Sequence, residues 1–293
     1  MSRIHQALSK AARERANQNG STTSADIAEI AAEVSGIGAQ AEKLQVVLPQ
    51  SPEVEAPASR LQRSTTDFVR SEWELDPRFD ALAAGAKDKA GAECFRTLKS
   101  RLHQVADTRP LRRIMVTSSV PSEGKSFVCA NLAHAMAQHN RRVLLIEADL
   151  RIPTLHTMFS APRSPGLSNY LRGESDEYAT ISVGKRNNMY FMSAGDEVAN
   201  PSELFLGDRM KELMRFASES FDWVIVDSPP TLPVHDPSLL ADLCDGVLFV
   251  VRAAATDFEL VSKAAAEFRQ KNLLGVVFNH VEKAESYGQY YYR

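Results

Sequence analysis

The chain has 293 residues, a formal net charge of -3 and a hydrophobic fraction of 44%, which suit a large globular domain with an extension and argue against a basic nucleic-acid binder. Its three cysteines form no CxxC pair and indicate reduced thiols in a reducing compartment. The first residues carry no leader-like apolar stretch and no apolar run reaches about 18 residues, so we expect a soluble, cytoplasmic protein without nucleic-acid partners.

Two segments are expected to precede the folded domain. Residues 1–19 place Ile4, Leu8 and Ala11 at helical spacing among basic side chains, which predicts a short basic amphipathic helix; a solvated helical tail is the open alternative. Residues 20–85 are rich in Ala, Ser, Thr, Gln, Glu and Pro. This composition is typical of a linker, and we predict that the segment is largely disordered.

A folded domain is predicted from residue 86 to residue 293. It opens with apolar residues at steps of three and four, Ala92, Phe95, Leu98 and Leu102, as in a helix that enters a core. Later apolar runs lack alternation, which is typical of strands buried on both faces. We therefore expect an α/β fold, a mostly parallel β-sheet flanked by helices. The expected strands are 114–117, 142–146, 223–226, 247–251 and 274–278, and a further helix is expected at 127–139.

The strongest local motif is a phosphate-binding loop, the segment TSSVPSEGKS at residues 117–126. Gly124 lets the backbone approach phosphates, Lys125 reaches the β- and γ-phosphates, and the Ser126 hydroxyl can ligate magnesium. The usual first glycine of the pattern is replaced by Ser119. A chance GKS at a turn is the alternative, but the flanking strand and helix favour a P-loop NTPase. The expected nucleotide contacts in the loop are Ser119, Pro121, Ser122, Glu123, Gly124, Lys125, Ser126 and Phe127.

Three acidic residues follow predicted strands. Glu147 and Asp149 come after one apolar run, and Asp227 ends another. The carboxyl ends of parallel strands share one edge of a sheet, so these acids are expected to converge with the loop. A lone acid after a strand is more often a helix cap or a surface charge, which does not explain three acids beside a GKS motif.

These motifs resemble those of the bacterial tyrosine kinases of capsule and exopolysaccharide assembly, a branch of the Min/Par-type P-loop ATPases. The loop and following helix, residues 120–133, resemble the family's S-x-P-x-x-G-K-S/T segment. Residues 147–151, EADLR, are similar to its D-x-D-x-R motif with Glu147 in place of the first Asp, and residues 227–230, DSPP, resemble its Walker B segment. Further resemblances lie at 200–204 (NPSEL), at 275–279 (GVVFN), and in the ring-assembly helix motif at 93–99.

The resemblance implies an ATP- and Mg²⁺-dependent protein-tyrosine kinase. It implies catalytic roles for four residues, with Asp149 as the base that accepts the tyrosine proton: Lys125, Asp149, Asp227 and Glu147. Ser126 and Asp227 are then expected to hold the metal, with Glu147 assisting. Asn279 is implied near the adenine.

The final residues, 284–293, contain Tyr287, Tyr290, Tyr291 and Tyr292. A terminal aromatic strand is the structural alternative, but chain ends are mobile by default. The resemblance implies that these tyrosines are phosphoacceptors, modified in trans within a homo-oligomer. It also implies a stand-alone kinase recruited to the inner membrane by a chain-length-determining protein as activator, and a cognate tyrosine phosphatase.

A Min/Par-like ATPase switch without kinase activity is the rival interpretation. Such proteins usually carry an additional lysine near the start of the phosphate loop. Residues 117–124 contain no lysine, which favours the kinase.

Overall fold

The computed structural model describes residues 68–83, 89–138, 140–185 and 188–281. The helix predicted at 1–19, the linker up to residue 67 and the tail at 284–293 lie outside these ranges.

An eight-stranded sheet forms the centre of the domain, in the order β1-β4-β5-β3-β6-β2-β7-β8. All neighbouring strands are parallel except β4 and β5, so the prediction of a mostly parallel sheet is confirmed. The strands are β1 (Val69–Arg70), β2 (Arg113–Ser118), β3 (Val143–Glu147), β4 (Ile181–Val183), β5 (Met189–Met192), β6 (Trp223–Asp227), β7 (Gly246–Arg252) and β8 (Leu273–Asn279).

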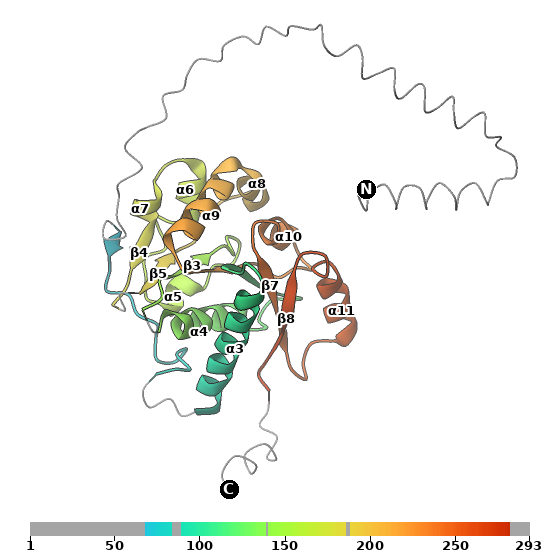
Figure 1. Cartoon of the computed structure of the whole chain (residues 1–293). Helices are drawn as coiled ribbons and strands as arrows, with labels where there is room; N and C mark the ends of the chain where they lie inside the picture. The colour runs from blue at the N-terminus through green and yellow to red at the C-terminus, as the bar shows by residue number, and fades with distance from the viewer. Residues whose placement is uncertain (1–67, 84–88, 139, 186–187, 282–293) are drawn as a thin grey trace, which may run out of the picture. The chain divides into compact units, whose positions relative to one another are not determined.

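Helices cover both faces of this sheet (Figure 1). Side chains along β2 alternate between the two faces: Ile114 and Val116 pack with α3, α4 and α5, whereas Met115 packs with the other helices. Both faces are therefore buried, which explains the apolar runs in the sequence. On the first face lie α3 (Lys89–Thr108), α4 (Lys125–Ala137) and α5 (Leu155–Met158); on the second lie α6 (Leu167–Arg172), α7 (Glu177–Thr180), α8 (Pro201–Leu206), α9 (Asp208–Ser220), α10 (Asp236–Ala241) and α11 (Phe258–Ala266).

Within the described ranges, no helix combines the length and the hydrophobicity that a membrane span requires.

Residues 68–83, here called the N-terminal arm, differ from the prediction of a linker up to residue 85. The arm contributes β1 to the edge of the sheet beside β4 and buries Phe68, Trp73 and Leu75. The sequence did not predict this, because residues 20–85 are rich in Ala, Ser, Thr, Gln, Glu and Pro and these few apolar residues are too widely spaced to form a periodic pattern. The folded unit therefore includes the residues from Phe68 onward, and a truncation at residue 85 would remove part of its core.

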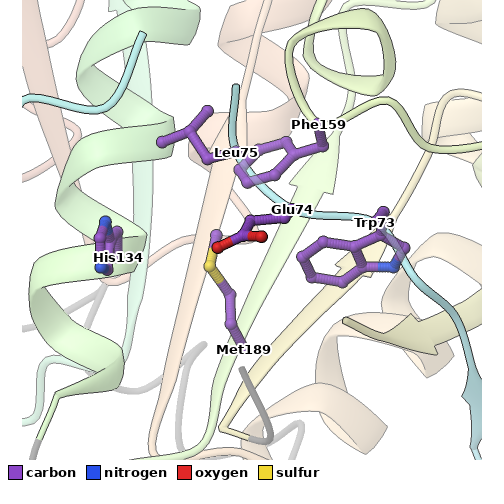
Figure 2. A pocket seen from close by; sticks show the side chains of 6 residues that line it. All are labelled: Trp73, Glu74, Leu75, His134, Phe159 and Met189. Atoms are coloured by element: carbon purple, nitrogen blue, oxygen red, sulfur yellow. The ribbon is translucent and has the colours of Figure 1, made fainter. Parts of the chain in front are cut away.

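Trp73 anchors the arm. Its ring is 4% exposed and packs edge-on against Phe159 and Phe191, at centroid distances of 5.4 and 5.9 Å. Its indole N–H donates to the Ser182 hydroxyl at 2.8 Å. Figure 2 shows Trp73, Phe159 and neighbouring side chains around a small pocket beneath the arm, with His134 on the facing helix α4.

Two polar side chains of α4 bind the backbone and an acid of the arm. Asn131 accepts the N–H of Ala81 at 2.7 Å and donates to the carbonyl of Phe79 at 2.8 Å. One turn later, Nδ1 of His134 lies 3.0 Å from the Asp80 carboxylate. Because α4 begins at the phosphate loop, the arm is attached to the helix that carries this loop.

Trp73→Ala should destabilise the protein by about 3–5 kcal/mol, because it removes a large buried ring and leaves the Ser182 hydroxyl without its donor. Chemical denaturation of the full chain measures this loss. Glu72→Ala, one residue earlier and exposed, is the matched control and should change stability by less than about 0.5 kcal/mol. Equal stability of the two variants would contradict the placement of the arm in the core.

Candidate functional site

The phosphate loop connects β2 to α4 at the carboxyl edge of the sheet, as the sequence predicted. Gly124 caps α4 with φ 93° and ψ 26°, and Ser122 also has a positive φ of 65°. This positive φ is strained for a residue with a Cβ, which would also displace the side-chain amide of Asn279, so the turn favours glycine. No side chain caps the first turn of α4, which leaves its backbone N–H groups for an anion.

Glu123 and Asn279 hold the loop in place. The buried Glu123 carboxylate accepts the N–H of Val120 at 2.9 Å, the Thr256 hydroxyl at 2.7 Å and the N–H of Arg252 at 3.2 Å. Asn279 donates from its amide to the Glu123 carbonyl at 2.9 Å. Both residues were predicted as nucleotide contacts; in the structure, these side-chain bonds tie the loop to the ends of β7 and β8.

Ser126 and Asp227 meet directly. The Ser126 hydroxyl donates to Asp227 Oδ2 at 2.7 Å, and Lys125, itself 8% exposed, precedes Ser126 at the start of α4. Asp227 is fully buried at the end of β6, and burial raises its pKa to about 7 against the opposing effects of Lys125 and the Ser126 bond. The predicted convergence of loop and acid is present in the geometry.

Two further side chains touch this pair and were not singled out in the sequence. The Thr154 hydroxyl donates to Ser126 Oγ at 2.9 Å, and the Cys129 thiol lies 3.5 Å from Asp227 Oδ1. No motif marks Thr154, which reaches the site from the loop after β3. The sequence marks Cys129 only as one of three cysteines without a CxxC partner, although its place four residues after Lys125 puts it on the first turns of α4.

Asp149 and Arg151 lie on the loop that follows β3. The Asp149 carboxylate accepts the N–H of Ile152 at 3.0 Å. Burial raises its pKa, whereas backbone N–H groups and Lys125 lower it. Arg151 pairs with Asp236 at 2.7 Å, and Ser202 also donates to Asp236. Arg151 is thus a partner of α8 and α10, and these contacts fix the loop that carries Asp149.

Glu147 was predicted to assist at the metal, and in the structure its carboxylate is bound by groups of the protein. Its carboxylate is fully buried and accepts the N–H groups of Ala194 at 3.0 Å and His156 at 3.2 Å. Nδ1 of His156 also lies within 3.2 Å of both carboxylate oxygens. Both oxygens are therefore engaged by protein groups, because the longer side chain reaches past the strand end to β5 and α5.

The site fits a nucleotide phosphate with a hydrated divalent cation. Within the described residues, no group of three or more His, Cys, Asp or Glu side chains forms a metal cage. Magnesium usually needs none, since it is bound by one or two protein oxygens together with substrate phosphates. Ser126 and Asp227 supply such oxygens, and the raised pKa of Asp227 reflects a buried carboxylate that a cation would stabilise. The tyrosines at 287–292 lie outside the described residues.

Comparison with known proteins gives concordant results. A family model described as the CobQ/CobB/MinD/ParA nucleotide binding domain matches residues 114–291. The tyrosine-protein kinase YwqD of Bacillus subtilis is 35% identical over 215 residues, which cover 72% of this chain and 91% of YwqD. The tyrosine-protein kinase Etk of Escherichia coli K12 is 33% identical over 70% of this chain, but the match spans only 28% of Etk.

Solved structures agree with this result. The kinase domain of Escherichia coli tyrosine kinase ETK superimposes with a TM-score of 0.67 at 31% identity, covering 74% of this chain and 85% of that domain. The chimerical protein CapA2B2 gives the same TM-score at 28% identity, covering 74% of this chain and 95% of the chimera. The MinD protein of Pyrococcus horikoshii, at 18% identity and a TM-score of 0.52, shares the fold.

Glu147→Gln should lower the free energy of unfolding by about 1.5–3 kcal/mol. The wild-type carboxylate accepts two backbone N–H groups, whereas the NH₂ group of Gln is a donor and would face one of them. The magnesium concentration needed for half-maximal nucleotide binding should change less than about twofold. Asp227→Asn is the comparison variant and should raise that concentration markedly, since it removes a proposed ligand. If Glu147→Gln raises this magnesium concentration as much as Asp227→Asn does, Glu147 is a metal ligand and the interpretation is wrong.

Proposed function

The chain belongs to the CobQ/CobB/MinD/ParA nucleotide-binding family and, within it, to the bacterial tyrosine kinases, and we propose that it transfers the γ-phosphoryl group of ATP to tyrosines of its own C-terminal segment. The observation that carries this proposal is the contact between Ser126 and Asp227 beside Lys125, at the carboxyl ends of parallel strands. The same edge holds Asp149, so a phosphate site and a proton acceptor lie close together.

ATP would enter with Mg²⁺, which neutralises phosphate charge and orients the transferred group. Lys125 stabilises the charge that develops on the phosphoryl oxygens. Ser126 and Asp227 would hold the metal, and the N–H groups at the start of α4, which no side chain caps, would bind the phosphates. The bonds of Glu123 and Asn279 keep these groups in place before the nucleotide arrives.

Asp149 is our candidate for the general base. A tyrosine hydroxyl has a reference pKa near 10 and stays neutral in the cell, so a positioned carboxylate is needed to take its proton. Burial raises the pKa of Asp149, which makes the carboxylate a stronger proton acceptor than an exposed one. The pairing of Arg151 with Asp236 restrains the same loop.

The acceptors in this proposal are Tyr287, Tyr290, Tyr291 and Tyr292 of a second copy of the chain. Arg96 and Glu93 lie exposed on α3, in the segment that resembles the ring-assembly helix, and form an ion pair of 3.0 Å within that helix. We further propose a membrane chain-length-determining protein as activator, a tyrosine phosphatase as antagonist, and control of exopolysaccharide polymerisation and export as the role of the kinase.

Lys125→Ala should lower autophosphorylation by about 10²- to 10³-fold, because the variant lacks a cation at the transferring phosphoryl group. Phosphotyrosine is measured by mass spectrometry after incubation with ATP and Mg²⁺. Lys271→Ala is the matched control, since that lysine is 2.9 Å from Asp242 and bonds to Ser238 on the opposite side of the sheet. Unchanged phosphotyrosine in Lys125→Ala would refute the assignment of the site.

Replacing all four tail tyrosines by Phe should abolish tail phosphorylation and leave ATP binding unchanged, because only acceptor hydroxyls are removed.

Mixed with Lys125→Ala, this active but acceptor-less protein should phosphorylate the inactive partner's tail. Each phosphotyrosine adds about -1.5 to -2 charge, so tail modification should also loosen the assembly, as light scattering detects. Failure of the mixed pair would indicate phosphorylation within one chain.

A further inference from the structure

We infer that the hydroxyl groups of Ser119 and Thr231 form a contact for the terminal phosphate of ATP, which would make this site prefer ATP to ADP. The inference rests on the proposed function and assigns a residue, Thr231, that no motif points to. It also gives the Ser119 side chain a role of its own at the position where the phosphate-loop pattern has glycine.

The two residues are neighbours because the chain after β6 continues alongside the start of the phosphate loop. The N–H of Ser228 donates to the Val116 carbonyl at 3.1 Å, and the N–H of Thr231 donates to the Ser118 carbonyl at 2.8 Å. One residue later, the N–H of Leu232 donates to the Ser119 carbonyl at 3.2 Å. The segment 227–232 thus runs alongside the first residues of the loop and is joined to them by backbone hydrogen bonds.

These two segments, 116–119 and 227–232, carry five hydroxyl side chains, and three of them are paired. Thr117 donates to the Pro229 carbonyl at 2.9 Å, and Ser118 donates to the Val120 carbonyl at 2.9 Å. Ser228 donates to the Val116 carbonyl at 3.0 Å.

The other two hydroxyls are different. Ser119 is fully buried and Thr231 is 8% exposed, yet neither oxygen has a hydrogen-bond partner. In the described part of the chain, they are the only buried side-chain oxygen or nitrogen atoms without one. Buried polar atoms are normally paired, so two unpaired hydroxyls on adjacent segments of a binding site indicate a ligand that accepts their hydrogen bonds.

The position of the pair points to the terminal phosphate. In the proposed function, the start of α4 and Lys125 would bind the phosphates, and Ser126 with Asp227 would hold the metal. Thr231 lies four residues beyond Asp227, and its N–H bonds to the Ser118 carbonyl at the opening of the loop. A phosphate oxygen is anionic and accepts hydrogen bonds from both hydroxyls, whereas ADP presents no third phosphate to them.

The test uses the full chain with Thr231→Val, an isosteric change that removes only the hydroxyl. We expect the affinity for the β,γ-imido analogue of ATP with Mg²⁺ to fall about tenfold, and the affinity for ADP with Mg²⁺ to change less than about twofold. Calorimetric titration measures both. The melting temperature of the nucleotide-free variant should rise by about 2–4 °C, because an unpaired buried hydroxyl has been replaced by a methyl group. Ser119→Ala should shift both quantities in the same directions.

Thr180→Val on α7 is the matched control. This residue is also buried, but its hydroxyl donates to the Asp176 carbonyl at 2.9 Å, so this variant should melt at a lower temperature and keep the wild-type ratio of affinities. Thr231→Ser retains a hydroxyl and should retain the preference for the ATP analogue.

Three outcomes would overturn the inference. If Thr231→Val weakens both nucleotides equally, the residue only shapes the loop. If its melting temperature falls as in Thr180→Val and neither affinity changes, the hydroxyl binds only an internal water. If the wild-type chain binds neither nucleotide, the proposed function fails and this inference fails with it.

Discussion

The parallel pairing of β2 with β6 is the constraint on which the site depends. Val116 is in register with Asp227, so the strand that leads into the phosphate loop and the strand that delivers the buried acid end side by side. The loop then turns through Gly124 and brings Ser126 within 2.7 Å of Asp227. A slip of one residue would turn the Asp227 side chain to the other face of the sheet and break this contact.

Three buried acids lie at this edge, and their carboxylates have different hydrogen-bond partners. Glu147 is in register with Asp227 on the next strand, but its carboxylate is satisfied by Ala194 and His156. Asp149 accepts a backbone N–H and is otherwise close to Lys125, while Asp227 has the Ser126 hydroxyl and a pKa raised to about 7 by burial. The Glu147 carboxylate is thus bound by two backbone N–H groups, whereas Asp149 and Asp227 each have fewer protein partners.

The phosphate loop is supported from several distant parts of the chain. Glu123 reaches the segment after β7, and Asn279 comes from the end of β8. On the other side of the domain, the N-terminal arm binds Asn131 and His134 of α4, the helix that starts at Lys125. A loop that must hold several phosphate charges needs such rigid support, because flexible donors would lose entropy on binding.

The sequence by itself determined the central strands, the helix after the loop and the meeting of the loop with Asp227. Long apolar runs and a GKS motif are local signals, and parallel strands end at one edge whatever the rest of the fold does. It could not determine β1, β4 and β5, which have two to four residues and show no period. Only the tertiary structure decided that Trp73 belongs to the core, that Glu147 and Glu123 bind backbone N–H groups, and that residues 231–232 bond to the carbonyls of residues 118–119. Each of these depends on which distant donor or ring faces the side chain, and residue spacing along the chain does not contain that information.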